Sequence, residues 1–321
     1  MNKTELEHII EKFINNKNGI VAEIFFVLKN PRGDILKRAD IEVAAQTKLK
    51  EEFIENLDVG LIKNEELSIL PISNYDERKN VLYEYDLEQF PEGLNVLNEL
   101  QMTDDFPLFS FDNDSLEDIN GIIILIHYDD NTLISYKRNY SINLYKRDRN
   151  GIPLIKWGNS TRFKEMPDDD ILRIYPDFDF FQLNNNLFIR HINILEKFFS
   201  FHEIIKSTAV RALSKIDTAN LIEDIDSLGE MIEDITFARK LTKIGSHSPV
   251  LNKIPANIII EFVKTYPTLR GKFEFNDDNS RIKLTTKRSK NLFLKLLNDD
   301  FLQSQLTELH YDSLAKETVE I

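Results

Sequence analysis

The spacing of hydrophobic and polar residues changes between Asp177 and Phe201. Strict alternation at first predicts a strand, with Phe178, Phe180 and Gln182 on one face and Asp179, Phe181 and Leu183 on the other. Residues 184–186 are all asparagine, which tolerates positive φ, so they predict a tight turn. Apolar positions then recur at helical spacing, at Ile192, Leu195, Phe198 and Phe199. A strand, a turn and an amphipathic helix are therefore expected here.

Residues 1–57 show helical, extended and again helical patterns. Thr4 followed by Glu7 predicts a capping box at the start of a short amphipathic helix. The apolar stripe of this helix contains Leu6, Ile9, Ile10, Phe13 and Ile14. Residues 20–29 predict a buried strand, and the turn residues at 30–33 lead to a second strand over 34–43. A hairpin is expected there, followed by a helix over residues 44–57.

The middle of the chain predicts a β-meander. Residues 121–128 form a continuous apolar strand, residues 129–131 a turn, and residues 132–138 and 141–147 alternate as further strands. Shorter strands at 152–157 and 171–174 are expected to continue the meander to Asp177.

Beyond His191 the pattern becomes mainly helical. Helices are predicted over residues 192–206, 208–226, 228–243 and 255–264, and a β-hairpin at about 272–285 precedes a last helix. This order suits a decorated helical bundle better than a winged module. We predict an α+β protein of two domains. Residues 1–190 form a mixed α/β domain with an antiparallel β-meander, and residues 191–321 form a mainly helical domain with a β-hairpin.

Bulk properties exclude several classes of protein. The 321 residues include no cysteine, so disulfide frameworks, zinc–thiolate sites and cysteine nucleophiles are excluded. No apolar run approaches the roughly 20 residues that span a bilayer, and the N-terminus lacks the apolar core of a signal peptide. We expect a cytoplasmic protein that reaches a membrane only through a partner.

Charge is distributed unevenly along the chain. The net charge is −14, but residues 1–130 contain 28 acidic and 12 basic side chains, so this part carries −16 and the remainder about +2. The overall sign argues against non-specific adhesion to polyanions, while local basic clusters can still face one.

The first basic cluster lies between Tyr136 and Lys164. Its bases are Lys137, Arg138, Lys146, Arg147, Arg149, Lys156, Arg162 and Lys164, and Asp148 is its one acid. Tyrosines and Trp157 are interleaved with them. Lysine and arginine neutralise phosphates and aromatic rings stack on exposed bases, so this composition suits a nucleic-acid surface. The alternative is that strand alternation places the cations on the solvated side of a half-buried sheet.

The second basic cluster contains no acid between its ends. It consists of Arg281, Lys283, Lys287, Arg288, Lys290 and Lys295. Cations near the start of a helix oppose its macrodipole, and this cost is easier to understand if an anion binds there. Ordinary solvated bases are the alternative. Arg239, Lys240 and Lys243 close an otherwise acidic helix, where the dipole alone accounts for them, and they form a minor candidate.

Motifs for enzymatic chemistry are weak. Asp168, Asp169 and Asp170 could join Glu203 and Lys206 in a magnesium-dependent nuclease site. However, Glu203 and Lys206 are three residues apart on a predicted helix and match a solvated ion pair. The sequence contains no phosphate-binding glycine loop, nucleophile elbow or paired-histidine motif. We therefore expect no catalytic residue, no metal and no cofactor.

Three segments carry a resemblance to a known family: YKRNYSINLYKR, DFDFFQLNNNLFIRHINILEKFFSF and LLNDDFLQSQL. Over about residues 121–321 the chain resembles the KwaB family, the soluble component of the bacterial Kiwa anti-phage defence system. The resemblance implies a homodimeric cytoplasmic effector that acts with the membrane-embedded protein KwaA at the inner membrane. It also implies DNA binding that impedes phage DNA replication and late transcription. It assigns no binding residues.

The leading hypothesis is a non-enzymatic, DNA-binding defence effector. The residues expected to contact phosphate are Lys137, Arg138, Lys146, Arg147, Arg149, Lys283, Lys287, Arg288 and Lys290. The alternative is an adaptor that senses infection by contacting KwaA or anionic lipid without binding DNA. A metal-dependent nuclease is a lower alternative.

Overall fold

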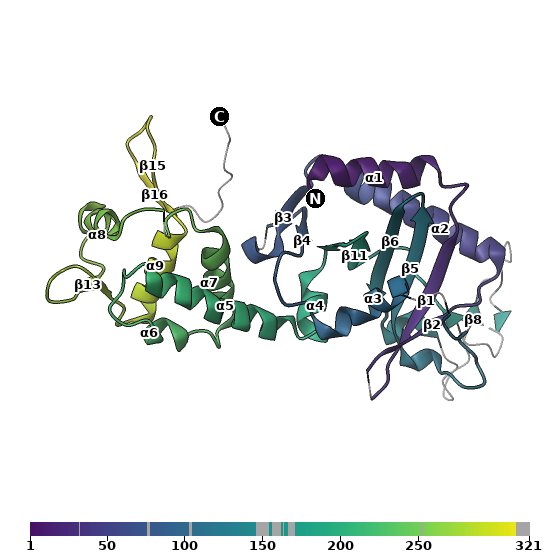
Figure 1. The fold of residues 1–321 in the computed structure, drawn as a ribbon. Coiled ribbons are helices and arrows are strands. Elements are labelled where there is room, and N and C mark those ends of the chain that lie inside the picture. Colours follow the sequence, from purple (N-terminus) through teal and green to yellow (C-terminus); the bar gives the residue numbers. More distant parts are fainter. Residues whose placement is uncertain are drawn as a thin grey trace. The chain divides into compact units, whose positions relative to one another are not determined.

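A computed structural model describes residues 1–31, 33–75, 78–102, 105–145, 154–155, 162, 164–165, 171–251 and 253–312. The chain forms two compact units, which are drawn in Figure 1. Unit 1 contains Met1–Ile69, Asn80–Glu84 and Glu92–Leu195, and unit 2 contains Leu70–Lys79, Tyr85–Pro91 and Glu196–Ile321. The division at residue 190 into two separately folding domains stays a prediction.

An eight-stranded sheet forms the centre of unit 1, in the order β2-β1-β5-β6-β11-β12-β4-β3. Its strands are β1 (Ala22–Leu28), β2 (Ile35–Arg38), β3 (Ser68–Pro71), β4 (Val81–Glu84), β5 (Ile119–Tyr128), β6 (Asn131–Arg138), β11 (Phe180–Leu183) and β12 (Asn186–Ile189). The neighbours from β2 through to β4 pair antiparallel. The predicted hairpin of β1 and β2 is confirmed.

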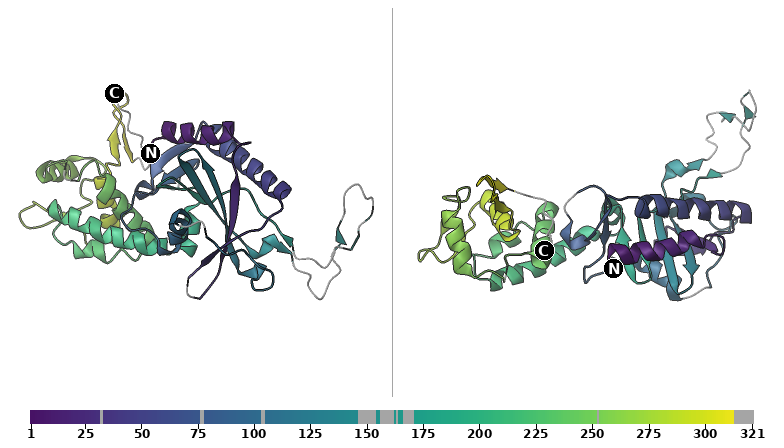
Figure 2. Two further views of the ribbon diagram at one scale, coloured as in Figure 1. Left: turned by 45° about the vertical axis from the view of Figure 1, so that its right-hand side comes forward. Right: turned by 90° about the horizontal axis from the view of Figure 1, so that it is seen from above.

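Both faces of this sheet bury large apolar side chains. One row across the strands joins Phe25, Ile123, Tyr136, Phe180 and Ile189, all of them buried. The adjacent residues Ile24, Ile124 and Phe181 belong to the opposite face and to the core beneath α1 (Lys3–Asn15) and α2 (Val43–Leu57). Figures 1 and 2 show these two helices side by side over that face, with α3 (Asn95–Met102) on the other side of the sheet. Burying such side chains stabilises the unit by about 1.5–3 kcal/mol each.

The start of α1 differs from the prediction. The side chain of Asn2 accepts the backbone N–H of Glu5 at 2.9 Å, and the Glu5 carboxylate accepts the N–H of Asn2 at 3.0 Å. The capping box is therefore made by Asn2 and Glu5, and the prediction of Thr4 and Glu7 was wrong. Asparagine is at least as good an N-cap as threonine, so the helix begins before Thr4. The predicted apolar stripe is confirmed, since Leu6, Ile10 and Phe13 are buried.

The predicted meander is confirmed for β5 and β6 but not for the segment after them. Residues 141–143 form a 3-10 turn instead of a strand, and β6 pairs directly with β11. β7 (Leu144–Tyr145) pairs with β10 (Ile171–Leu172), and β8 (Leu154–Ile155) pairs with β9 (Lys164–Glu165), in two small sheets outside the main one. The tight turn between β11 and β12 is confirmed by Asn184, whose φ is 54°.

The helix predicted over residues 192–206 is broken in two. α4 (Ile192–Phe198) ends before Ser200, which has a φ of 51°, and α5 (Phe201–Thr218) begins after it. A left-handed residue cannot continue a right-handed helix. The break explains a second error: Phe199 is buried as expected, but Phe198 is 40% exposed.

Unit 2 is mainly helical. Besides α5 it contains α6 (Asp226–Gly229), α7 (Ile235–His247), α8 (Ala256–Thr265) and α9 (Lys287–Leu297). The unit also contains two hairpins. β13 (Glu274–Phe275) pairs with β14 (Ile282–Lys283) between α8 and α9, and β15 (Phe301–Gln303) pairs with β16 (His310–Asp312) after α9. The predicted hairpin at about 272–285 is confirmed. α5 and α7 pack closely, because a Cβ atom at Gly245 would lie 2.5 Å from that of Ala212.

The fold class is confirmed: an α+β protein with a sheet-rich N-terminal part and a more helical C-terminal part. Within the described ranges, no helix combines the length and apolar character needed to cross a membrane.

Candidate nucleic-acid interface

The second basic cluster lies on β14 and the start of α9. Thr286 caps α9, since its hydroxyl accepts the backbone N–H of Ser289 at 3.1 Å. This cap places Lys287 and Arg288 in the first helical turn, where the unpaired N–H groups give the helix end its positive character. Both side chains are exposed. The local sequence therefore concentrates positive charge at one helix end, as predicted.

Three lysines of this cluster pair with acids from other parts of unit 2. Lys283 lies 3.4 Å from Glu223, Lys287 lies 3.4 Å from Asp234, and Lys290 lies 3.6 Å from Glu230. The acids belong to the segment that leads from α5 to α7, more than 50 positions earlier in the chain. The sequence has no local signal for such distant pairs, so the cluster is less positive in space than its composition suggests.

Asp234 links this cluster to α7. Its carboxylate accepts the backbone N–H groups of Thr236 and Phe237 as the N-cap of the helix. Burial would raise the pKa of Asp234, but the bond from Phe237 and the nearby ammonium of Lys287 lower it below its usual value. Lys287 therefore reinforces a helix cap, although its own side chain is 69% exposed.

Arg288 differs from its neighbours. It is exposed, and within the described part of the chain it makes no ion pair or side-chain hydrogen bond. An arginine offers five N–H donors in a planar fork that matches a phosphate. Among the predicted phosphate contacts that the structure describes, Arg288 is therefore the one best placed to bind an external anion.

Lys137 and Arg138, from the first basic cluster, belong to a network at the end of β6. The Lys137 ammonium lies 3.1 Å from Asp177 and 3.2 Å from Asp179. Asp179, whose side chain is 5% exposed, also contacts His191 Nδ1 at 2.8 Å and accepts the backbone N–H of Arg138 at 2.7 Å. This arrangement gives Lys137 a role in the fold, and its contact with phosphate stays a prediction.

The charges in this network stabilise one another. Burial would raise the pKa of Asp179, but the contacts with His191, the N–H of Arg138 and the Lys137 ammonium lower it below its usual value. Burial would likewise lower the pKa of Lys137, and the carboxylates of Asp179 and Asp177 outweigh that effect and raise it. Both groups are therefore held in their charged forms.

Several predicted residues lie outside the described residues. These are Lys146, Arg147, Arg149 and Lys156 of the first basic cluster and the three aspartates Asp168, Asp169 and Asp170 of the nuclease alternative. Glu203 and Lys206 are described, and their ammonium and carboxylate lie 3.6 Å apart as the predicted solvated pair. In the described part of the molecule, no three histidine or acidic residues converge on a possible metal position.

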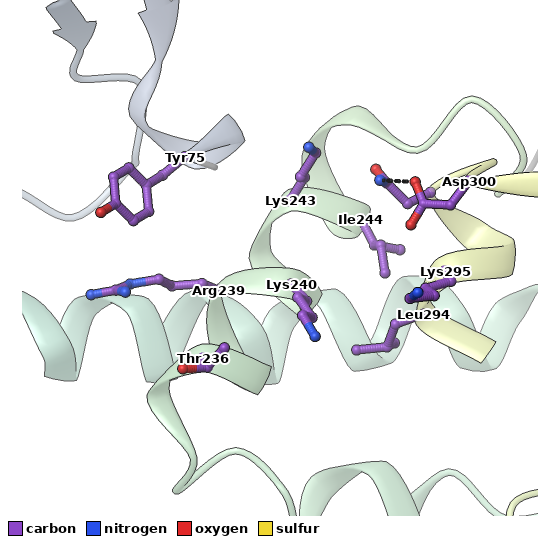
Figure 3. Close-up of a pocket in the computed structure, with 10 residues that line it drawn as sticks. Tyr75, Thr236, Arg239, Lys240, Lys243, Ile244, Leu294, Lys295 and Asp300 are labelled. Atoms are coloured by element: carbon purple, nitrogen blue, oxygen red, sulfur yellow. Dashed lines mark hydrogen bonds between the residues drawn. The ribbon is translucent and has the colours of Figure 1, made fainter. Parts of the chain in front are cut away.

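The structure forms a third basic site in unit 2, at residues that the charge pattern alone makes only a minor candidate. A pocket of about 280 Å³ lies between α7 and α9. Figure 3 shows its lining residues, with Tyr75 beside Arg239. Its lining residues are Tyr75, Thr236, Arg239, Lys240, Lys243, Ile244, Leu294, Lys295, Asn298 and Asp300. The minor candidate on α7 thus meets Lys295 of the second cluster. The spacing of Thr236, Lys240 and Lys243 on one helical face was the available signal.

Tyr75 reaches the pocket because the segment of residues 70–75 is anchored to α7 through Ser73. The hydroxyl of Ser73 contacts His247 Nε2 at 2.5 Å and donates to Asp86, which also accepts the Ser73 N–H at 3.0 Å. Burial would raise the pKa of Asp86, but its contacts with His247 and Ser73 lower it. The Arg239 guanidinium lies 5.0 Å from the Tyr75 ring centroid and pairs with Glu196. These contacts fix one wall of the pocket.

Comparison with known proteins identifies relatives. A family model described as "Kiwa protein KwaB-like" matches residues 116–307. The curated Kiwa protein KwaB of Escherichia coli is 34% identical over 326 residues, and the alignment covers 100% of both chains. No solved structure matches the chain.

Proposed function

The chain belongs to the KwaB-like family of Kiwa proteins, and from this premise we propose that it is a non-enzymatic effector of anti-phage defence that binds DNA. In this proposal, binding impedes replication and transcription of phage DNA. The protein acts as a homodimer with KwaA, the membrane-embedded companion implied by the family resemblance. KwaA recruits it from the cytoplasm to the inner membrane. No metal or cofactor takes part.

The observation that carries the DNA-binding proposal is the exposed positive end of α9. Arg288 is exposed and no acid occurs among residues 281–295. The helix dipole and the guanidinium favour a phosphate at the same place. Such a contact is independent of base sequence, so we propose binding through the DNA backbone rather than base recognition.

The acids that pair with Lys283 and Lys287 do not prevent this role. Both pairs are separated by 3.4 Å and involve exposed or half-exposed side chains. Exposed ion pairs contribute about 0.2–1 kcal/mol, so a lysine can exchange its carboxylate for a phosphate at low cost. The same acids reduce the charge of the free protein and would limit indiscriminate binding. Lys290, which is 9% exposed, contributes less.

A salt series with duplex DNA tests the proposal. Fluorescence anisotropy would measure the DNA affinity of three proteins: wild type, Arg281→Glu/Arg288→Glu, and Lys146→Glu/Arg147→Glu/Arg149→Glu. The matched control is Lys197→Glu, an exposed lysine on α4. Wild-type affinity should fall by about 0.9 log units per neutralised phosphate per log unit of salt. A variant that removes phosphate contacts should have a shallower slope. Absence of binding by folded wild type at low salt would refute the DNA-binding function.

A second candidate function, the adaptor, is favoured by the hairpin of β15 and β16. Its exposed apolar side chains are Leu302, Leu306, Leu309 and Tyr311, and Leu306 is 96% exposed. Contiguous exposed apolar side chains mark interaction surfaces. If this hairpin contacts KwaA, the variant Leu306→Ser/Leu309→Ser should lose co-purification with KwaA and keep the DNA affinity of wild type. Retained co-purification would remove the hairpin from the partner surface.

A further inference from the structure

The pocket between α7 and α9 concentrates positive charge. It is lined by the four cations Arg239, Lys240, Lys243 and Lys295, and by one carboxylate, that of Asp300. Arg239 pairs with Glu196, whereas Lys240 donates to the neutral amide oxygen of Asn291 at 3.2 Å, a contact that does not offset its charge. Like charges brought together destabilise one another, and an anion in the pocket would relieve this repulsion.

The same pocket has an apolar part. Its lining includes the buried side chains of Ile244 and Leu294, which we call its apolar floor, and the ring of Tyr75, all of them labelled in Figure 3. A simple inorganic anion gains no favourable contact from apolar side chains. A floor beside several cations matches a ligand that carries both an anionic group and a planar apolar group. The volume of about 280 Å³ is close to the lower end for small-molecule sites, roughly 300 Å³.

The walls of the pocket are held by contacts that need no ligand. Ser73 fixes the segment of Tyr75 through His247 and Asp86. The close approach of Gly245 to Ala212 fixes α7 against α5. On the α9 side, the amide of Asn298 donates to Asp300 at 2.6 Å, as the dashed line in Figure 3 marks. A site formed in advance binds with a smaller entropic penalty.

From these observations we propose that the pocket binds a nucleoside polyphosphate. Lys240, Lys243 and Lys295 would contact the phosphates, and the base would lie against Ile244, Leu294 and Tyr75. This site is separate from the proposed DNA contact at Arg288, and the inference does not depend on DNA binding. A protein that binds DNA and a nucleotide at separate sites could couple its activity to nucleotide concentration.

Isothermal titration calorimetry with three probes tests the ligand class. ATP supplies both groups, inorganic tripolyphosphate only the anion, and adenosine only the base and sugar. ATP should bind at least about tenfold more tightly than either fragment, because each fragment loses one set of contacts. Tripolyphosphate binding as tightly as ATP would show that the apolar floor plays no part and would overturn the nucleotide assignment. Absence of ATP binding by the folded full-length protein would refute the proposal.

Variants locate the site. Lys240→Gln/Lys295→Gln removes two cations without adding bulk and should weaken ATP binding by roughly tenfold or more, since bonds to charged groups are the stronger ones. Lys272→Gln, at an exposed lysine of the same unit outside the lining, is the matched control and should bind ATP within about twofold of wild type. Tyr75→Leu should weaken ATP more than tripolyphosphate. Equal ATP binding by the double variant and the control would place the site elsewhere.

The DNA assay keeps the two proposals distinct. Tyr75→Leu, at a pocket residue outside both basic clusters, should keep wild-type DNA affinity and salt slope, while Arg281→Glu/Arg288→Glu should keep wild-type ATP binding. If the pocket variant loses DNA and ATP binding together while circular dichroism shows it folded, the claim of a separate nucleotide site is overturned.

Discussion

Lys137 in unit 1 and Arg288 in unit 2 both lie in basic stretches of the chain, but their surroundings differ. Two carboxylates contact the Lys137 ammonium, and one of them, Asp179, is 5% exposed. Arg288 is exposed at the start of α9 and has no ion pair with any described residue. A basic residue therefore supports either the fold or a ligand according to the acids that the fold brings to it.

The largest effect should come from removing the buried acid. Asp179→Ala leaves the Lys137 ammonium, His191 and the N–H of Arg138 without their shared acceptor. We expect a loss of about 2–4 kcal/mol in the free energy of unfolding, because a half-buried charge then lacks its main partner. Urea denaturation followed by circular dichroism measures this loss.

Asp177→Ala is the matched control for that variant. Asp177 contacts the same lysine, but its side chain is 36% exposed. Its removal should cost less than about 1 kcal/mol, as for other exposed pairs. Equal losses for the two variants would mean that burial of Asp179 does not decide the energetics of the network.

The next effect concerns DNA. Arg281→Glu/Arg288→Glu should weaken duplex binding by roughly tenfold or more and lower the salt slope by about 0.9 for each lost phosphate contact. Its stability should stay near that of wild type, because Arg288 is exposed and Arg281 is only partly buried. An unchanged slope in the variant would remove these two arginines from the interface.

The free energy of unfolding at acidic pH should depend on the same network around Asp179. The pKa of Asp179 is lowered in the folded protein, so its contribution is complete above the unfolded pKa of about 3.9 and is lost as the pH falls through the folded pKa. The free energy of unfolding should therefore fall on acidification below about pH 4, and less steeply in Asp179→Asn. Parallel profiles for the two proteins would contradict the lowered pKa.

The smallest effect should come from the exposed pair of Lys283 and Glu223. Glu223→Gln removes a contact of 3.4 Å between half-exposed side chains and should change the free energy of unfolding by less than about 0.5 kcal/mol. It should also strengthen DNA binding slightly, because Lys283 loses its competing acid. Weaker DNA binding in this variant would argue against exchange between carboxylate and phosphate.

Local patterns predicted most elements of the fold. The continuous apolar run of β5, the alternation in β6, the asparagine turn at Asn184 and the apolar stripe of α1 each depend on neighbours within a few residues, and all four are confirmed. The break at Ser200 was missed because serine carries little preference for a left-handed conformation. Two segments, Leu70–Lys79 and Tyr85–Pro91, belong to unit 2 through contacts such as that of Ser73 with His247. No local sequence pattern predicts such contacts.

The candidate site was predictable in its composition but not in its pairing. The run from Arg281 to Lys295 is visibly basic, and the structure places its first helical turn at the surface. The acids Glu223, Glu230 and Asp234 reach its lysines only through the tertiary fold. For the same reason the pocket was missed, because Tyr75 and Lys295 come from distant parts of the sequence.

The most direct test of the account compares Lys137→Gln with Arg288→Gln in two assays, urea denaturation and duplex DNA binding across a salt series. Each variant removes one charge. We predict a crossover: Lys137→Gln loses more stability than Arg288→Gln, while Arg288→Gln loses more DNA affinity and more of the salt slope than Lys137→Gln. The opposite pattern, in which folded Lys137→Gln loses DNA binding and Arg288→Gln binds as wild type does, would contradict it.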